Sequence, residues 1–246
     1  STRKESSAAS DVYKRQIDST NIRAKLEAEQ GAKSGLLVVS DMQSAGRGRR
    51  GRSWESPAGT NIYYTLMLKP DFSSDCAPML TLVMALAVAK GIRQTLRRDS
   101  EEAAAKVGIK WPNDIVVDGK KVCGILTEMS MEQGYIQHIV IGVGINVRKQ
   151  EFPEEIRDRA AAIDEQCGFR ISRSQLIADI MEAFEEDYEI FLRTHDLKGL
   201  RASYAELLVN QDREVCVLDP KGEYRGIARG LSLIHISEPT RLGMIS

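Results

Sequence analysis

Four strand-like segments follow one another between residues 107 and 147, and this stretch constrains the fold more than any other part of the chain. The second and third are separated by Asp118-Gly119, a pair that favours the positive φ angles of a tight hairpin turn. Clustered strands with helices in separate runs, rather than strict alternation of the two, predict an α+β fold. The four segments span residues 107–111, 114–117, 121–129 and 135–147.

The remaining elements lie on either side of this cluster. Apolar or β-branched runs predict strands at 35–41, 61–68, 214–219 and 223–230, the last two as a hairpin around Pro220-Lys-Gly. Apolar residues at helical spacing predict helices at 75–98, 174–192 and 196–209. Pro78 suits the first turn of the first helix, and Arg97 and Arg98 suit its C-terminal end.

Composition excludes several classes of protein. The chain has 246 residues, 42% of them hydrophobic, and its 34 Lys+Arg and 35 Asp+Glu give a net charge of −1. The apolar fraction is too high for a disordered chain, and the charge balance argues against a globally basic nucleic-acid binder. The most apolar window, Leu80 to Ala89, is about half the ~20 residues that span a bilayer, so no membrane segment is predicted. Four cysteines without a CxxC pair and three scattered histidines predict reduced thiols, no dedicated metal site and a cytoplasmic location.

The two ends of the chain differ from its middle. Residues 1–16 are polar and carry no periodic pattern, and residues 231–246 break off a strand-like pattern without a turn signal. Both resemble translated adapter or vector sequence, and an ordinary disordered terminus is the alternative interpretation. We therefore leave both ends out of functional reasoning.

The segment from Gly46 to Arg52 holds four arginines and three glycines in seven residues. The glycines disfavour helix and strand, so these residues are predicted to form a flexible cationic loop, called the arginine loop below. Guanidinium groups and exposed backbone N–H groups both suit phosphate, and such a loop can close over an anion as a lid. On composition alone, an RG-type contact to nucleic acid fits equally well.

Further motifs bring polar side chains to the ends of predicted elements. Asp18-Ser-Thr-Asn21 and Gln43 offer hydroxyl and amide groups to a small polar ligand, although Asp or Ser before a helix is usually only an N-cap. Lys110-Trp-Pro-Asn-Asp114 ends a strand at proline, and Lys121 follows seven residues after Asp114. We expect Asp114 and Lys121 to pair across the hairpin, where a purely structural salt bridge is as compatible as a functional one. Gly142-Val-Gly-Ile-Asn146 lacks the third glycine of a dinucleotide fingerprint.

Together, these segments resemble the catalytic domain of the biotin protein ligase family. They occur in the family's order, as DSTN, Q-x-AGRGRRGR-x-W, KWPND, K-x-x-GIL and G-x-GIN, and the similarity covers residues 17–230. The resemblance implies an α+β fold of the class II aminoacyl-tRNA synthetase/biotin synthetase type, with a mixed, largely antiparallel sheet and helices. It also implies a biotin- and ATP-binding catalytic domain at 17–208 and an incomplete SH3-like β module at 209–230.

The resemblance further implies an activity and its partners. The family activates biotin with ATP and Mg²⁺ to biotinyl-5′-AMP and then transfers biotin to one lysine of a carrier domain. Mg²⁺ is expected on the ATP rather than on protein ligands. The expected partner is the biotin acceptor domain of a biotin-dependent carboxylase. A homodimer through edge-to-edge sheet pairing is common in the family, and no membrane or nucleic-acid partner is expected for this chain.

Site residues are implied where the motifs match the family. Those expected to contact biotin are Ser19, Thr20, Asn21, Gln43, Gly46, Arg47, Gly48, Arg49, Lys121, Gly124 and Gly142. Those expected to contact ATP or the adenylate are Arg47, Arg49, Arg50, Arg52, Trp54, Lys110, Asn113 and Asn146. The expected catalytic residues are Lys121, Arg49 and Asp114.

Other functions stay open at this point. A lipoate ligase-like acyltransferase is the alternative within the fold, and the complete arginine loop argues against it because that family lacks the loop. From other classes, the chain is compatible with an arginine-loop nucleic-acid-binding protein or an inactive repressor-type sensor. Interleaved aromatic residues near the loop would favour nucleic acid, but only Trp54 qualifies.

Overall fold

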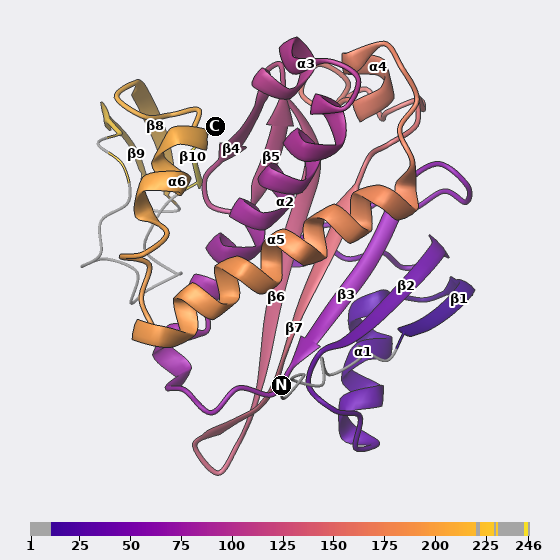
Figure 1. The fold of residues 1–246 in the computed structure, drawn as a ribbon, viewed down its shortest axis with the longest axis vertical. Helices are drawn as coiled ribbons and strands as arrows, with labels where there is room; N and C mark the ends of the chain where they lie inside the picture. The colour runs from indigo at the N-terminus through magenta and orange to yellow at the C-terminus, as the bar shows by residue number, and fades with distance from the viewer. Residues whose placement is uncertain (1–10, 220–221, 229, 231–243, 246) are drawn as a thin grey trace, which may run out of the picture.

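A seven-stranded mixed sheet forms the centre of the protein (Figure 1). The structure, a computed structural model, describes residues 11–219, 222–228, 230 and 244–245. In spatial order the strands are β1 (Asp11–Ile17), β2 (Leu36–Gln43), β3 (Ile62–Leu68), β7 (Tyr135–Ile145), β6 (Lys120–Glu132), β5 (Asp114–Val117) and β4 (Val107–Lys110). Only β1 and β2 run parallel; the other neighbours are antiparallel. The predicted α+β fold with a largely antiparallel sheet is confirmed.

The predicted strand cluster forms through local turns. Asp118 and Gly119 adopt φ values of 50° and 75° and join β5 to β6, as expected for a tight hairpin. Gln133 and Gly134 adopt φ values of 50° and 88° and join β6 to β7, so the third strand runs three residues beyond its predicted end at residue 129.

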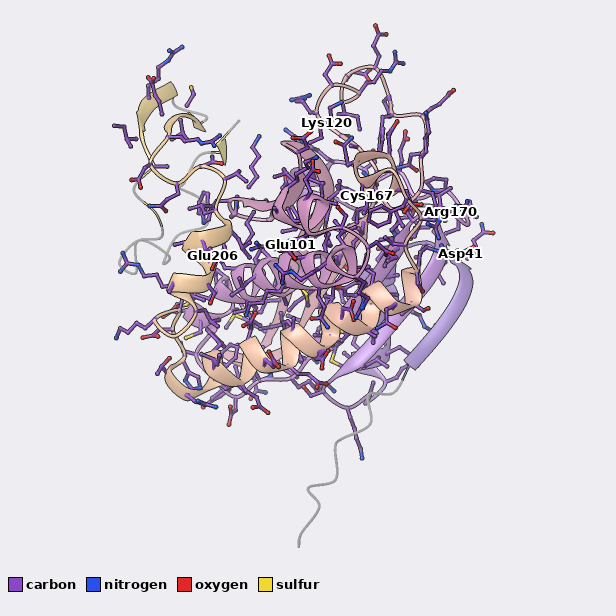
Figure 2. The ribbon with its side chains drawn as sticks, turned by 45° about the horizontal axis from the view of Figure 1, so that its top comes forward. Asp41, Glu101, Lys120, Cys167, Arg170 and Glu206 are labelled. Atoms are coloured by element: carbon purple, nitrogen blue, oxygen red, sulfur yellow. The ribbon has the colours of Figure 1, made fainter. Side chains whose placement is uncertain are left out.

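Two long helices cover one face of the sheet. These are α2 (Met79–Arg97) and α5 (Arg173–Thr194), and Figure 2 shows α5 in front of α2. The other helical segments are α1 (Thr20–Glu29), α3 (Glu101–Ala105), α4 (Ile163–Cys167), α6 (Arg201–Leu207) and the short 3₁₀ turns Arg49–Gly51 and Ser74–Cys76. Helix α6 is shorter than the predicted 196–209.

Helix α1 packs against the opposite face of the sheet. Alternate residues of a strand point to opposite faces. Accordingly, Ile139 and Ile141 of β7 belong to the main core with α2, whereas Val140 packs against Ala24 and Ala28 of α1. Helix α1 covers only part of its face, and this leaves room for a site beside it.

Helix α2 is unusually apolar. With the 3₁₀ turn before it, the segment Ser74–Arg97 is long and apolar enough to cross a membrane by length and composition, longer than the sequence window suggested. However, 67% of its most apolar window is buried inside the protein, between the sheet and α5. This packing accounts for the apolar composition, which is therefore weak evidence for a membrane span.

Replacing Gly91 with alanine should destabilise the packing of α2 on α5. A Cβ atom there would lie 2.5 Å from Ile180 Cγ1 and 2.8 Å from both Cα and the backbone nitrogen of Ile180. Since backbone cannot move without separating the helices, we expect a loss of about 1–3 kcal/mol in the free energy of unfolding, measured by urea denaturation. The exposed neighbour Gln94 is the control, and Gln94→Ala should stay within about 0.5 kcal/mol. Equal stability of the two variants would contradict this packing.

The ends of the chain differ from the prediction. Residues 11–16 are not disordered, because they form most of β1 and pair with β2 from Asp11↔Leu37 to Ile17↔Gln43. Met244–Ile245, in the excluded tail, form β10 and pair with β8 (Glu214–Asp219). The foreign origin of these segments stays a prediction, and residues 1–10 and 231–243 lie outside the described part.

The expected C-terminal hairpin is present. Strand β8 pairs with β9 (Gly222–Ile227) in antiparallel fashion, and Asp219 and Gly222 are the paired residues next to the turn. The backbone N–H of Val209 donates to the carbonyl of Ile109 at 3.0 Å, which attaches this part of the chain to β4. The SH3-like character of the module and the domain boundaries stay predictions.

Candidate functional site

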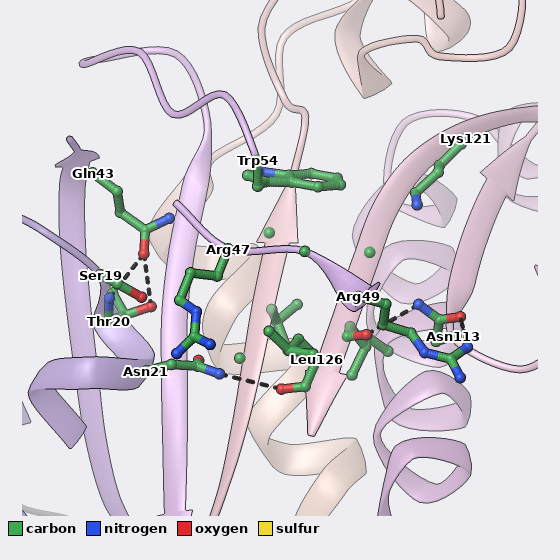
Figure 3. A pocket seen from close by; sticks show the side chains of 16 residues that line it. Ser19, Thr20, Asn21, Gln43, Arg47, Arg49, Trp54, Asn113, Lys121 and Leu126 are labelled. Atoms are coloured by element: carbon green, nitrogen blue, oxygen red, sulfur yellow. Dashed lines mark hydrogen bonds between the residues drawn. The ribbon is translucent and has the colours of Figure 1, made fainter. Parts of the chain in front are cut away.

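A pocket opens on the α1 face of the sheet, between the N-terminus of α1 and the arginine loop (Figure 3). It encloses about 470 Å³ of space, a volume that includes open solvent at its mouth. Each of the five sequence motifs contributes some of its residues. The lining consists of Ser19, Thr20, Asn21, Gln43, Arg47, Gly48, Arg49, Trp54, Asn113, Lys121, Gly124, Ile125, Leu126, Gly142, Val143 and Gly144.

Glycines form the floor of the pocket. Gly142 and Gly144 of β7 point to the same face as Val140, and Gly124 lies opposite Gly144 on β6. A Cβ atom at Gly142 would lie 2.0 Å from Asn21 Oδ1, and one at Gly144 would lie 2.6 Å from Trp54 Cε2. The glycines therefore make room for these two side chains, while a ligand's close approach to Gly124 or Gly142 stays a prediction.

The polar end of the pocket is built around the first turn of α1. Ser19 occupies the N-cap position but its side chain makes no capping hydrogen bond. Instead, Gln43 Oε1 accepts hydrogen bonds from the Thr20 backbone N–H at 2.8 Å and from Thr20 Oγ1 at 3.1 Å. Gln43 Nε2 in turn donates to Ser56 Oγ at 3.0 Å. Interpreting Asp18-Ser-Thr-Asn21 as only an N-cap is thus insufficient, because Gln43 accepts from the Thr20 N–H while Ser19, Thr20 and Asn21 line the pocket.

Trp54 forms a wall over the glycine floor. Its ring lies 2.8 Å from the Cβ position of Gly124 and within 5.4 Å, centroid to Nζ, of Lys121. Its backbone pairs with Gly46, and Ser56 Oγ donates to its carbonyl at 3.0 Å. The Tyr63 hydroxyl donates to the carbonyl of Pro57 at 3.1 Å, which holds the segment that follows Trp54, and burial raises the pKa of Tyr63 to about 12. Stacking of Trp54 on adenine stays a prediction.

A β-bulge turns Lys121 toward the pocket. Along β6, Cys123 and Ile125 face the main core, so regular alternation would also send residue 121 there. The pairing with β5 shifts between Ile115↔Cys123 and Val116↔Lys121, which inserts one extra residue on β6. Such a bulge re-aims the side chain that follows it. Lys121 consequently shares the face of Gly124.

Cationic side chains occupy the remaining side of the pocket. Lys121 Nζ lies 2.7 Å from Asp114 Oδ1, so the predicted pairing across the hairpin is confirmed. Arg49 donates from Nη1 to Asn113 Oδ1 at 3.0 Å, and Asn113 Nδ2 donates to the Ile125 carbonyl at 3.1 Å. These contacts hold the arginine loop against the β4–β5 turn (Figure 3).

Glu128 is a site residue that sequence reasoning missed. It lies on β6 behind Asn21 and accepts hydrogen bonds from Asn21 Nδ2 at 2.8 Å and Lys25 Nζ at 2.9 Å. Arg47 Nη1 lies 3.4 Å from its Oε1. Burial opposes ionisation of Glu128, but the hydrogen bonds from Asn21 and Lys25 and the charges of Lys25 and Arg47 hold its pKa below the ordinary value.

Several expected site residues do not line the pocket. Gly46 packs against the backbone of Trp54: a Cβ atom at Gly46 would lie 2.2 Å from the Trp54 carbonyl oxygen, so only glycine fits this part of the loop. Lys110 ends β4 opposite Asp114. Asn146 is buried beyond the end of β7, and its backbone N–H donates to the Val122 carbonyl. Arg50 and Arg52 belong to the loop at and after its 3₁₀ turn. Their roles toward ATP stay predictions.

The pocket offers no obvious set of metal ligands. Within the described ranges, no group of three or more His, Cys, Asp or Glu side chains is placed to hold a metal ion. The donors that converge on the pocket are hydroxyls, amides and cations, which suit a polar organic ligand and anionic groups.

Known proteins resemble this chain in sequence and in fold. Residues 12–146 match the model of the biotin/lipoate A/B protein ligase family. The chain is 40% identical over 199 residues to the "bifunctional ligase/repressor BirA" of Bacillus subtilis. The matched region covers 79% of this chain and 59% of that protein. It is 40% identical over 130 residues to the biotin–[acetyl-CoA-carboxylase] ligase of Paracoccus denitrificans, covering 53% of this chain and 51% of that protein.

A solved structure extends the likeness to the fold. The biotin protein ligase of Aquifex aeolicus in complex with biotin and ATP superposes with a TM-score of 0.74 at 29% identity, covering 91% of this chain and 88% of that one. The chain spans about three fifths of the length of the first curated relatives. Because the family model covers more than half of its residues, this chain belongs to the biotin/lipoate A/B protein ligase family, with a catalytic domain of the biotin protein ligase type.

Proposed function

We propose that this chain is an ATP-dependent biotin ligase, which forms biotinyl-5′-AMP and transfers the biotinyl group to a lysine of a carrier domain. One observation supports this above the others. A single pocket holds hydroxyl and amide groups at one end and Arg49 and Lys121 at the other, with Arg47 between them (Figure 3). The polar end suits a ureido ring, and the cationic end suits a carboxylate and a phosphate.

The first step brings two anions together. A carboxylate oxygen of biotin attacks the α-phosphorus of ATP, the bond to the β-phosphate breaks, and pyrophosphate leaves. Positive charge aimed at the developing negative charge is the main source of catalysis in such a transfer. We assign this part to Arg47, Arg49 and Lys121. Mg²⁺ would arrive on the phosphates of ATP and neutralise part of their charge.

The second step is acyl transfer. The amine nitrogen of the carrier lysine attacks the acyl carbon, the bond to AMP breaks, and the nitrogen loses a proton. We assign Lys121 to the carbonyl oxygen, where charge develops. Asp114, 2.7 Å from Lys121 Nζ, orients that lysine or takes the proton.

The remaining expectations belong to the same proposal. The acceptor is the biotin carboxyl carrier domain of a carboxylase, and the reaction takes place in the cytoplasm, without membrane or nucleic-acid partners of this chain. A homodimer through edge-to-edge pairing would use β1 or β4, the edge strands of the main sheet.

The decisive experiment is pyrophosphate release from MgATP with biotin, followed by transfer of labelled biotin to a carrier domain. Release that needs biotin, and label on the carrier only when both substrates are present, would support the proposal. Release with lipoate and none with biotin would overturn it, in favour of a lipoate ligase-like enzyme.

Arg49→Gly should make the adenylate leak while biotin binding stays measurable. The substitution removes the Arg49–Asn113 bond of 3.0 Å and one cation of the pocket. Losing a charged hydrogen bond costs about 1.5–3 kcal/mol, so dissociation of labelled adenylate should be about tenfold faster or more. Rapid filtration measures the rate. Unchanged retention would show that the loop does not act as a lid.

A further inference from the structure

Glu128 joins three parts of the protein through one carboxylate. Its Oε2 accepts from Asn21 Nδ2 at 2.8 Å, and its Oε1 accepts from Lys25 Nζ at 2.9 Å and lies 3.4 Å from Arg47 Nη1. Asn21 and Lys25 are four residues apart and therefore share one face of α1. The side chain of Glu128 is only 20% exposed.

The contact of Glu128 with Asn21 is more buried than its contact with Arg47. The Arg47 side chain is 48% exposed, and exposed ion pairs contribute little to the position of either partner. Asn21 is buried, at 4% exposure, and its amide is held from both ends. Its Oδ1 accepts from Thr65 Oγ1 at 2.6 Å, while Nδ2 donates to Glu128.

An ionised carboxylate fixes the direction of the Asn21 amide. Carboxylate oxygens only accept hydrogen bonds, whereas the Thr65 hydroxyl can donate or accept. The NH₂ group of Asn21 must therefore face Glu128, and its carbonyl must face Thr65 and the space above Gly142. Asn21 Nδ2 also donates to the Leu126 carbonyl, but at 3.5 Å this is the longer of its two hydrogen bonds (Figure 3). A neutral amide at position 128 can donate as well as accept, so it would leave only this longer bond to oppose the reversed orientation of Asn21.

We infer that Glu128 is a positioning residue, which sets the donor and acceptor directions that Asn21 presents to a biotin-like ring in the pocket. This inference rests on the proposed function, because it takes biotin as the ligand. Glu128 acts through Asn21, since Asn21 lines the pocket and Glu128 does not.

The test compares Glu128→Gln with Lys25→Met. Glu128→Gln keeps the size of the side chain and removes its charge, so we expect the Kd and KM for biotin to rise about tenfold, equivalent to about 1.4 kcal/mol. The kcat for pyrophosphate release and the KM for ATP should stay within about threefold. Lys25→Met removes the Lys25 hydrogen bond to Glu128 and leaves that of Asn21 in place, so its biotin Kd should stay within about twofold of wild type.

The outcomes separate the inference from the proposed function. Biotin Kd is measured by calorimetry, without turnover, and circular dichroism establishes that each variant is folded. An unchanged biotin Kd in Glu128→Gln, or an equal loss in Lys25→Met, would overturn the inference even if the wild type is fully active. A parallel loss in kcat and ATP KM would also overturn it, since general damage would then explain the effect. If the wild type neither binds nor uses biotin, the proposed function itself fails.

Discussion

Replacing Lys121 with methionine should lower the rate of biotin-dependent pyrophosphate release by about 10²–10³-fold, the usual cost of removing one group that stabilises transition-state charge. Lys121 lines the pocket and is held 2.7 Å from Asp114 and 5.4 Å from the centroid of Trp54. Methionine keeps most of the apolar stem that packs beside the ring and removes only the charge. The Kd for biotin should change far less than kcat, because the polar end of the pocket is untouched.

Lys120 provides a matched control one residue away. It lies on the same strand but is exposed on the outside of the molecule (Figure 2), so Lys120→Met should leave the rate within about twofold. Single-turnover formation of labelled adenylate measures the chemical step for both variants. A rate for Lys121→Met within tenfold of wild type would contradict a role for this lysine in charge stabilisation, and equal losses in both variants would point to a general effect on β6.

The hairpins of the sheet could be predicted because their signals are local. Asp118-Gly119 marks the β5–β6 turn, and the apolar runs around it are short and β-branched. Strand β1 could not be predicted, because its pairing with β2 is parallel and involves residues 20 or more positions apart. Helix α1 lacked a strong apolar stripe, since the buried side chains of its inner face are mainly the alanines Ala24 and Ala28 together with polar Asn21.

Much of the site could be predicted because its residues lie in short motifs. The motifs name the residue types, but they do not give directions. Lys121 faces the pocket only because of the bulge opposite Ile115 and Val116, and no residue in the sequence marks the position of this bulge. Glu128 has no motif of its own, and its partners Asn21 and Lys25 lie more than 100 residues earlier in the chain. The role of Glu128 depends on tertiary contacts, which sequence patterns do not predict.

Replacing Gly142 with alanine should weaken biotin binding by about 10- to 100-fold. The new Cβ atom would lie 2.0 Å from Asn21 Oδ1 and 2.8 Å from Asn21 Cγ, which is far inside van der Waals contact. The close atoms all belong to one side chain that can rotate, so the fold should survive. Asn21 would then lose its bonds to Thr65 and Glu128, and groups left unpaired in a buried site cost about 1–3 kcal/mol each.

A double-mutant cycle decides whether Asn21 transmits this effect. Asn21→Ala alone removes the amide and should weaken biotin binding to a similar degree. In the Asn21→Ala background the clash no longer exists, so adding Gly142→Ala should change the biotin Kd by less than about twofold, and the two substitutions should couple by at least about 1 kcal/mol. Additive losses in calorimetric titrations would mean that Gly142 contacts the ligand directly, as the family resemblance implies, and that the contact with Asn21 is incidental. The cycle therefore distinguishes a glycine that makes room for a neighbouring side chain from one that makes room for biotin.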